Sequence, residues 1–415
     1  MEIKRDRYLT RLRKLRFKGG VKIVTGLRRS GKSYLLFNIL YNDLLDSGVS
    51  EDHIIRIALD SFENADLQDA TNLYNKVVSM LVDDSQYYVM IDEIQLAEGF
   101  ESVVNSLMRR KNVDLYITGS NSKFLSTDII TEFRGRGTQI NVRPLSFSEF
   151  IDAVDMDERK AWESYLTYGG LPDTVFLDDE EKVNYLTGLI DVVYLRDIVE
   201  RNKVKRQDIL VSVYDVLSSA VGSLTNPNRI TNVMKGRGIE VDGGTIKEYM
   251  GYYEDAFLFE ESKRFDLKGN AYIDTPSKYY SVDLGLRNAK LGFRQTEYTH
   301  LMENAIYNEL RYRGFSVDVG AIGIREYVNG KRESKQLEID FIANKGDVRY
   351  YIQSAYSIYG EGKEEQELRP FLKLNDSFRK IILVGEDAIR HYNEKGILIM
   401  NVIDFMKDPD SLLDM

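Results

Sequence analysis

The chain has 415 residues, which is long for one hydrophobic core, so its length predicts two or three domains. Its 43% hydrophobic and 29% charged content is typical of a globular protein, and its formal net charge of −10 argues against a protein that coats nucleic acid non-specifically. The absence of cysteine excludes disulfides and thiolate metal sites, and the 3 histidines leave little material for a histidine-based metal centre.

Residues 1–18 carry basic side chains between apolar ones, at a spacing typical of an amphipathic helix. We expect this helix to pack its apolar face on the domain that follows, although its basic outer face would also suit contact with nucleic acid. The segment is too basic for the apolar part of a signal peptide, and the chain has no apolar run long enough to span a membrane. We therefore expect a cytoplasmic location without membrane attachment.

A phosphate-binding loop occupies residues 26–33, which match the pattern G-x-x-x-x-G-K-[ST] at every fixed position. The apolar run 21–25 predicts a buried strand before the loop, and residues 34–40 have the apolar density of a helix packed on a sheet. Gly26 and Gly31 would let consecutive backbone N–H groups converge on one phosphate at the positive end of that helix.

Two side chains of the loop have the chemistry to hold a nucleotide and its metal ion. Lys32 would reach the β- and γ-phosphates, and the Ser33 hydroxyl would hold Mg²⁺. The residues predicted to contact the nucleotide are Gly26, Arg29, Ser30, Gly31, Lys32, Ser33 and Tyr34. The loop therefore predicts a nucleotide that is bound together with Mg²⁺.

Paired carboxylates follow another strand of the same predicted sheet. Residues 53–59 predict a second strand, and residues 86–91 predict a third that leads into Asp92 and Glu93. Open α/β sheets place their ligands at the carboxyl ends of their strands. Asp92 would join the Mg²⁺ shell through water, and Glu93 would orient and polarise the water that attacks the γ-phosphate.

Small polar groups and two arginines follow in the next predicted strands. Residues 114–121 predict a strand ending at Asn121, whose neutral amide would hydrogen-bond the γ-phosphate or the attacking water without adding charge. A fifth strand is predicted over residues 138–142. Arg134 and Arg136 precede it, where a guanidinium would reach the γ-phosphate of a neighbouring subunit; for each, a salt bridge is an equal alternative.

With these motifs in order, the chain resembles the AAA-type ATPases. The resemblance is to the prokaryotic subgroup with a C-terminal domain of unknown function that has a restriction-endonuclease-like core. The segments that carry it are residues 26–33, 90–95, 117–122, 135–136 and 144–147. It spans nearly the whole chain and implies a parallel sheet with strand order 5-1-4-3-2, ATP hydrolysis, Asn121 as the sensor and Arg136 as the better candidate for an arginine finger.

The middle of the chain reads as helical. Ser146 and Glu149 have the spacing of a capping box, and residues 182–201 predict an amphipathic helix in which Arg196 would touch the nucleotide or form a surface ion pair. Residues 207–266 predict a winged helix-turn-helix, with Thr245 as the N-cap of its third helix. That helix, residues 246–255, holds one lysine and three acids, which favours a protein contact over a DNA contact.

A DNA contact remains an alternative because of two basic residues in the turn before that helix, Lys235 and Arg237. After a predicted linker over residues 268–277, the last domain places Glu303 on a helix and Asp340 on a strand. That order resembles the restriction-endonuclease-like fold, whose active form ends the next strand with E-x-K.

Here Gln353 and Ala355 occupy the positions of that Glu and Lys, so we expect an inactive nuclease scaffold. The three acids Glu303, Asp340 and Glu338 could still hold a metal. The predicted α/β organisation is an AAA-type P-loop ATPase core (1–150), a helical lid (151–206), a winged helix (207–267) and a restriction-endonuclease-like domain (268–415).

The predicted function is that of an ATPase, with ATP and Mg²⁺ as cofactors, that assembles with copies of itself. It would act as a motor or remodeller on nucleic acid or on a protein partner. A slow nucleotide-dependent switch with a C-terminal recognition domain is the alternative, and a metal-dependent DNA nuclease is the third candidate.

Overall fold

The computed structural model describes residues 3–119, 133, 135–294, 297–328, 331–360 and 362–412. The chain divides into two compact units. The first holds Met1–Pro144 with Asp255–Phe257, and the second holds Leu145–Glu254 with Leu258–Met415.

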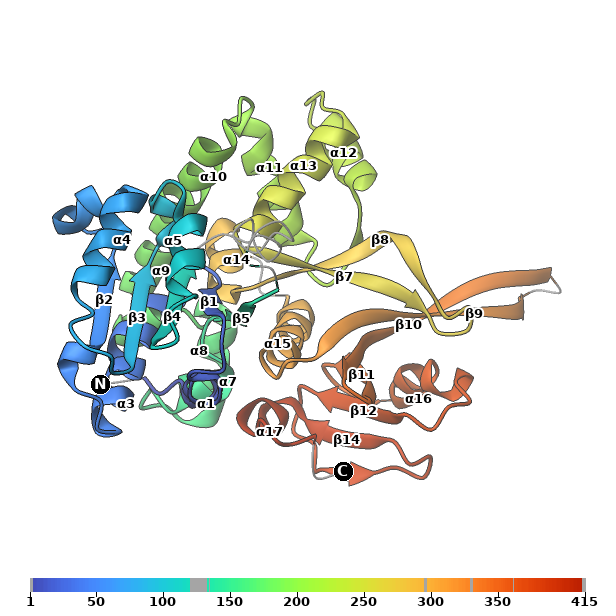
Figure 1. Ribbon diagram of the computed structural model, residues 1–415. Coiled ribbons are helices and arrows are strands. Elements are labelled where there is room, and N and C mark those ends of the chain that lie inside the picture. The colour runs from blue at the N-terminus through green and yellow to red at the C-terminus, as the bar shows by residue number, and fades with distance from the viewer. Residues whose placement is uncertain are drawn as a thin grey trace. The chain divides into compact units, whose positions relative to one another are not determined.

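The first unit is built on a five-stranded sheet in which every strand pair is parallel. Its strand order, β2-β3-β4-β1-β5, is the order predicted from the sequence and confirms a P-loop ATPase sheet of the AAA type (Figure 1). The strands are β1 (Val21–Thr25), β2 (Ile54–Ala58), β3 (Tyr87–Asp92), β4 (Val113–Gly119) and β5 (Gly137–Asn141).

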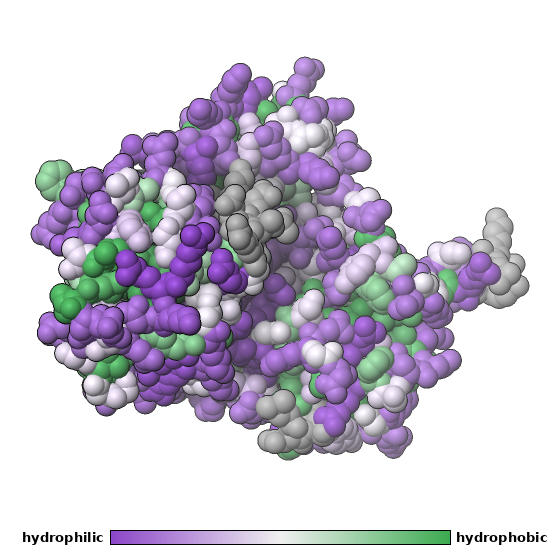
Figure 2. Space-filling view, viewed as in Figure 1, coloured by the Kyte–Doolittle hydropathy of each residue, from purple (hydrophilic) through white to green (hydrophobic). Residues whose placement is uncertain are grey.

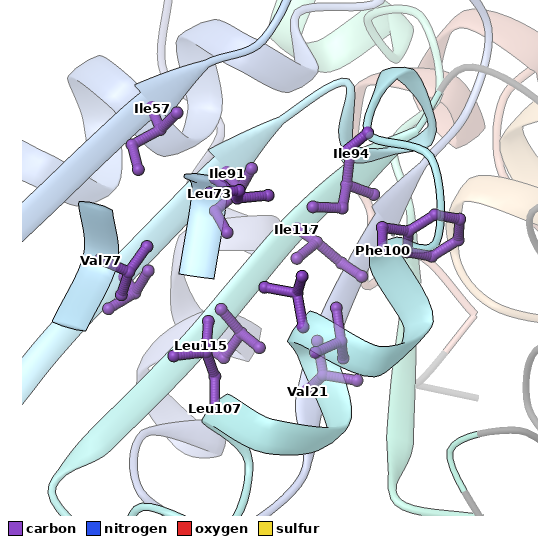
Figure 3. Packing of buried hydrophobic residues seen from close by; sticks show 14 of the residues in the cluster. Val21, Ile57, Leu73, Val77, Ile91, Ile94, Phe100, Leu107, Leu115 and Ile117 are labelled. Carbon is purple, nitrogen blue, oxygen red and sulfur yellow. The ribbon is translucent and has the colours of Figure 1, made fainter. Parts of the chain in front are cut away.

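Helices α4 (Ala70–Ser79) and α5 (Phe100–Leu107) cover one face of this sheet. Their buried residues, among them Leu73 and Leu107, pack against strand residues such as Ile91, Leu115 and Ile117 (Figure 3). Central strands β1, β3 and β4 are buried along their whole length, as expected for a parallel sheet with both faces covered. This rigid core fixes the strand ends at which the predicted site residues lie.

Helix α1 (Asp6–Leu15) is the amphipathic helix predicted near the start of the chain. It buries Tyr8 and Leu12, while Arg13 and Arg16 pair with the buried carboxylate of Asp43. The helix therefore packs on the first unit, as the sequence favoured, and part of its basic face is used in ion pairs.

The second unit begins with helices and continues into a large sheet. Ser146 and Glu149 form the predicted capping box of α7 (Phe147–Ile151). The helices that follow are α8 (Glu158–Tyr168), α9 (Asp179–Gly188), α10 (Leu195–Asn202), α11 (Gln207–Ser219), α12 (Pro227–Gly236), α13 (Gly243–Asp255), α14 (Leu284–Lys290), α15 (Tyr298–Tyr312), α16 (Lys363–Leu368) and α17 (Val402–Lys407). The predicted helix over residues 182–201 continues from α9 to α10 through a π-helical segment, Leu189–Tyr194.

One predicted cap is wrong. Helix α13 begins at Gly243, before Thr245, and the Asp242 carboxylate accepts hydrogen bonds from the backbone N–H (2.9 Å) and the hydroxyl (2.6 Å) of Thr245. Asp242, three residues before Thr245, thus accepts from the backbone N–H of Thr245, which is one of the first N–H groups of the helix that have no partner within it. Helices α11, α12 and α13 followed by a β-hairpin are the pattern behind the winged-helix interpretation, which stays a prediction.

The second unit holds a nine-stranded mixed sheet in the order β13-β14-β12-β11-β10-β9-β7-β8-β6. The strands are β6 (Leu224–Thr225), β7 (Phe259–Asp266), β8 (Ala271–Ser281), β9 (Ser316–Val328), β10 (Lys331–Lys345), β11 (Val348–Ala355), β12 (Arg379–Val384), β13 (His391–Tyr392) and β14 (Leu398–Asn401).

The prediction of a linker over residues 268–277 is wrong. Most of that segment belongs to β8, which pairs antiparallel with β7, so the predicted boundary after residue 267 falls inside a hairpin. The first half of β8 is mostly exposed and lacks the apolar alternation that marks a half-buried strand, which is why it read as a linker.

Candidate nucleotide site

The phosphate loop connects β1 to the short helix α2 (Lys32–Tyr34) through backbone conformations that favour glycine. Gly26 has φ 136°, and a Cβ atom there would lie 2.0 Å from the carbonyl oxygen of Val142. Gly31 has φ 89° and Arg29 has φ 63°. The two glycines that the motif requires are thus needed by the turn itself, since no other residue fits without strain.

The ammonium group of Lys32 is buried inside this loop. Its Nζ donates to the carbonyl oxygens of Gly26 and Leu27, each at 3.0 Å. Burial lowers the pKa of Lys32 to about 8, and the nearby carboxylates of Glu93 and Asp92 only partly oppose that shift. A phosphate at this position would restore the preference for the charged form, which is the environment expected of an anion-binding lysine.

Asp92 lies at the end of β3 with its carboxylate buried. Its Oδ1 accepts from the hydroxyl of Thr118 on β4, and a hydrogen bond also joins it to the Ser33 side chain. Burial raises the pKa of Asp92, while the bonds to Thr118 and Ser33 oppose the rise. Ser33 and Asp92, the two predicted Mg²⁺ ligands, are therefore together, and their hydroxyl and carboxylate oxygens are donors that suit Mg²⁺.

Glu93 follows directly and has left-handed backbone angles (φ 51°, ψ 47°). Its backbone N–H donates to the Thr118 hydroxyl oxygen at 2.9 Å, and its Oε2 accepts from the amide of Gln95. Such a conformation costs on the order of 1–3 kcal/mol in a non-glycine residue and is concentrated at functional sites. Thr118 thus fixes both acids, because it donates to one and accepts from the other.

Sequence reasoning missed two residues that support this site. Thr118 was part of a predicted strand, and only the pairing of β3 with β4 shows that it faces Asp92 and Glu93. Arg5 is almost fully buried and donates to the carbonyl oxygens of Ser30 (3.3 Å) and Arg143 (2.6 Å). It braces the phosphate loop from outside the motif, and no sequence pattern separates it from the other arginines of residues 1–18.

The remaining predicted contacts line the same loop. Ser30 is buried, and its hydroxyl has no hydrogen-bond partner among the described residues. Arg29 and Tyr34 are exposed, with 43% of the Tyr34 surface accessible. An unpartnered buried hydroxyl, a glycine cradle and a buried ammonium in one turn fit a phosphate-bearing ligand.

Arg136 lies at the edge of the sheet opposite to the phosphate loop. Its carbonyl oxygen accepts from the N–H of Val21 at 2.9 Å, at the start of β1, whereas the loop follows the end of β1. Five strand residues separate these two edges, about 16 Å. Its side chain is exposed and does not reach the loop of its own subunit. Asn121 and Arg134 lie outside the described residues.

Arg196 lies on α10 in the second unit. It is 70% exposed and pairs with Glu200 one turn later, with 2.7 Å between Nε and Oε1. This is the surface ion pair that formed one of the two predicted alternatives, although the partner is Glu200. Contact with a nucleotide stays a prediction for Arg196.

The second unit gathers the predicted acids around a lysine. Lys278 on β8 places its Nζ 2.9 Å from Glu303, 2.7 Å from Glu338 and 3.4 Å from Asp340. Although Ala355 stands where an active nuclease has its lysine, these acids do have a cation, because a different strand supplies one. Among the residues that the structure describes, no group of three or more acidic, histidine or cysteine side chains is arranged to hold a metal.

The charges of these four side chains shift one another's pKa values. The three carboxylates raise the pKa of Lys278 despite its burial. Burial also raises the pKa of Glu303 to about 7, against the lowering effect of Lys278. Gln353 lies on β11 opposite Asp340 and accepts a hydrogen bond from the Asp340 N–H at 3.4 Å. The cluster thus holds an ammonium and favours a proton on one of its acids.

In the described part of the chain, no helix combines the length and apolar character needed to cross a membrane.

Comparisons with known proteins match this architecture. Residues 18–151 match an AAA domain family, and residues 159–297 match a domain of unknown function (DUF8612). An uncharacterized protein of Haemophilus influenzae is 36% identical over 97% of this chain and 98% of its own length. An uncharacterized protein of Methanocaldococcus jannaschii is 27% identical over 92% of this chain and 85% of its own length.

Solved structures show weaker likeness. A Walker-type ATPase of Pyrococcus abyssi has a TM-score of 0.48 at 14% identity and covers 70% of this chain and 96% of its own. The Aeropyrum pernix ORC1 protein, solved in complex with DNA, has a TM-score of 0.32 at 13% identity, with 70% and 93% covered. Because both scores are low, the fold assignment rests on the strand order of the sheet and on the match to the AAA domain.

Proposed function

The chain belongs to a family of AAA-domain proteins, and from this premise we propose that it binds ATP with Mg²⁺ and hydrolyses it to ADP and phosphate. The observation that carries the proposal is the buried ammonium of Lys32, bonded to two loop carbonyls beside Asp92 and Glu93. A lysine with a lowered pKa, facing neutral carbonyls within a glycine turn, gains most from a bound phosphate.

The residues of this site have separable roles in the proposed reaction. Lys32 binds the phosphates, and Ser33 with Asp92 would hold Mg²⁺, which neutralises charge on the phosphate oxygens when it is bound. Glu93 accepts a proton from the attacking water, with its backbone fixed by Thr118 and its carboxylate by Gln95. Asn121 would orient the same water.

We propose that the protein works as a homo-oligomeric motor or remodeller, with a protein or nucleic acid as its target. The support is Arg136, which is exposed at the edge of the sheet away from its own loop, so that only a neighbouring copy would bring it to a γ-phosphate. A slow switch is the alternative. The two differ in turnover, because a motor is stimulated by its target and a switch holds ATP until its partner arrives.

A nuclease is the less supported candidate for the C-terminal domain. The Lys278 ammonium lies between Glu303, Glu338 and Asp340, in the space that a metal would need. A metal ion at that position would meet a fixed positive charge at close range, which opposes binding. The cluster therefore favours a scaffold that binds without cutting.

The test compares Lys32→Ala with Glu93→Gln in the full chain. Lys32→Ala should lose ATP affinity by at least about a hundredfold, because it removes a ground-state phosphate contact. Glu93→Gln should keep its affinity and lose turnover by about 10²–10⁴-fold, because only the attacking water needs the base. Nucleotide affinity and steady-state phosphate release, with and without DNA, measure both effects.

Glu98→Gln is the matched control, since Glu98 is exposed and lies on the loop that follows the same strand. It should behave as wild type. Turnover at the wild-type rate in Glu93→Gln would show that another group activates the water. Unchanged ATP affinity in Lys32→Ala would remove the basis of the proposed site.

A further inference from the structure

Strand β9 has an open edge in the second unit. Strand β7 pairs with it only from Val319 to Ala321, whereas β9 continues to residue 328. After β7 ends, the N–H of Leu267 donates to the Ala321 carbonyl at 3.0 Å, and Lys268 Nζ donates to the Gly323 carbonyl at 3.1 Å. In the described parts of the chain, no strand pairs with this edge beyond Ala321. Figure 1 shows β9 and β10 extending past the turn between β7 and β8.

The backbone of this edge has N–H and C=O groups that an added strand could bind. In a strand, the N–H and C=O of one residue point to the same side, and the side alternates along the chain. Because the carbonyls of Ala321 and Gly323 point away from β10, the N–H of Gly323 and both groups of Arg325 point the same way. They open into a groove of about 650 Å³ lined by Asp266, Lys268, Gly323, Ile324, Arg325, Glu326, Ser334, Lys335 and Lys373.

The groove is basic although the chain is acidic. Its four basic side chains, Lys268, Arg325, Lys335 and Lys373, are all exposed. Its two acids already have partners. Asp266 accepts from the backbone N–H of Lys268 at 3.0 Å, and Glu326 is paired with Arg369, which lowers the pKa of Glu326.

The cations flank the edge from both faces of the sheet. Arg325 is directly opposite Ser334 on β10, whereas Lys335 is opposite Ile324, so Arg325 and Lys335 project to different faces. A strand added at this edge would also place its successive side chains on alternate faces. Figure 2 shows hydrophilic residues, in purple, on the part of the second unit that extends to the right, with apolar residues, in green, among them.

We propose that this edge binds an extended, acidic segment of a partner protein by strand addition. The partner's backbone would pair with Gly323 and Arg325, and its acidic side chains would meet Arg325 on one face and Lys335 with Lys373 on the other. A nucleic acid would use the cations but has no amide backbone to pair with the strand, so the exposed ladder favours a peptide. The edge belongs to the second unit and shares no residue with the phosphate loop, so this proposal does not rest on the proposed ATP hydrolysis.

Gly323 gives a selective test of this pairing. A Cβ at Gly323 would have nothing within 4 Å, so Gly323→Ala should be tolerated. Gly323→Pro removes the N–H that points into the groove but breaks no hydrogen bond to β10. Proline is accepted at positions of this kind in an edge strand. The two variants differ in the donor that the proposal needs.

The probe is a fluorescein-labelled peptide of about eight residues, the length of a typical strand. Pairs of glutamates alternate with pairs of valines in it, so that the added strand carries glutamate on both faces. Its binding to the full chain, followed by fluorescence anisotropy at low salt, should weaken at least about tenfold in Gly323→Pro and stay unchanged in Gly323→Ala. The double variant Lys335→Glu with Lys373→Glu should weaken it by a similar factor, and added salt should weaken wild-type binding.

Wild-type affinity in Gly323→Pro with unchanged melting temperature would overturn strand addition. Equal binding of the same peptide with lysine in place of each glutamate would overturn the charge argument. Binding of single-stranded oligothymidylate without binding of the acidic peptide would replace the partner class by nucleic acid. If Gly323→Pro does not fold, the double charge variant decides, and its wild-type affinity for the peptide would refute the proposal.

Discussion

Lys32 and Lys278 are both buried, yet their surroundings shift their pKa values in opposite directions. Burial dominates at Lys32, where the hydrogen-bond acceptors are two neutral carbonyls, and lowers its pKa. At Lys278, three carboxylates within 3.4 Å outweigh burial and raise its pKa. Lys32 is therefore arranged to receive an anion, whereas Lys278 is already neutralised by the protein.

Lys278→Met should be strongly destabilising for this reason. It leaves three carboxylates together without their cation, and breaking such a buried pair typically costs about 3–5 kcal/mol. Mn²⁺ should recover part of the loss, because the vacated space between the acids then suits a divalent cation. Urea unfolding of the full chain without nucleotide, with and without Mn²⁺, measures both effects.

Lys160→Met is the control. Lys160 forms an exposed ion pair with Asp157, so this variant should lose little stability. Wild-type stability of Lys278→Met would show that the ammonium does not hold the acids together.

The same cluster also predicts the outcome of a nuclease test. Linear and supercoiled DNA should survive incubation with wild-type protein and Mg²⁺. DNA cleavage that disappears in Asp340→Ala would make the cluster a nuclease site.

At the scale of elements, helix α15 brings one acid of this cluster against β8 and β10. Its Glu303 accepts a hydrogen bond from the Tyr280 hydroxyl at 2.7 Å and has a pKa of about 7, raised by burial from 4.5. A raised carboxyl pKa stabilises the fold fully below about pH 4.5, and that contribution is lost as the pH rises through 7. The shift corresponds to a contribution on the order of 3 kcal/mol.

Glu303→Gln should remove this contribution to the pH dependence. Wild-type protein should lose more stability between pH 5 and pH 8 than the variant, by up to about 3 kcal/mol in the free energy of unfolding. The difference between the two proteins isolates Glu303, because Asp283, whose pKa is raised to about 6 by burial, contributes equally to both. Parallel pH profiles would place the shared proton elsewhere in the cluster.

The elements that the sequence predicted well are those with a short motif or a regular apolar pattern. The phosphate loop and the Asp92–Glu93 strand follow from local spacing, since each glycine, lysine or acid there has a specific backbone position to occupy. The order of the five strands does not follow from spacing, and it was predicted only through the resemblance to the AAA-type ATPases. The role of β8 could not be predicted in this way. Its exposed half lacks alternation, and Lys278 meets its acids only through pairings distant in sequence.

At the scale of the whole molecule, the position of Arg136 makes a prediction about assembly. If Arg136 acts on the nucleotide of a neighbouring copy, Arg136→Ala should keep ATP affinity and lose turnover by about 10³-fold or more. Mixing it with Lys32→Ala should restore part of the activity, because some interfaces then combine an intact loop with an intact arginine. Phosphate release by the mixture and by each variant alone measures the rescue.

That rescue requires the loop of an Arg136→Ala subunit to face the arginine of a Lys32→Ala subunit. Native mass spectrometry should first show that the two variants co-assemble. No recovery in such mixed assemblies would argue against action between subunits. Loss of ATP affinity in Arg136→Ala alone would indicate a structural role at the start of β5.

The two sheets also differ in the time during translation at which all their strands have been synthesised. The last strand of the first sheet ends at Asn141, so that sheet is fully synthesised early. The second sheet begins with Leu224 and is not complete until Asn401 has emerged, about 260 residues after Asn141, which takes roughly 10–50 seconds of translation. During that interval a nascent chain would carry a formed nucleotide site beside an unfinished sheet, which makes the second unit the part most in need of a chaperone.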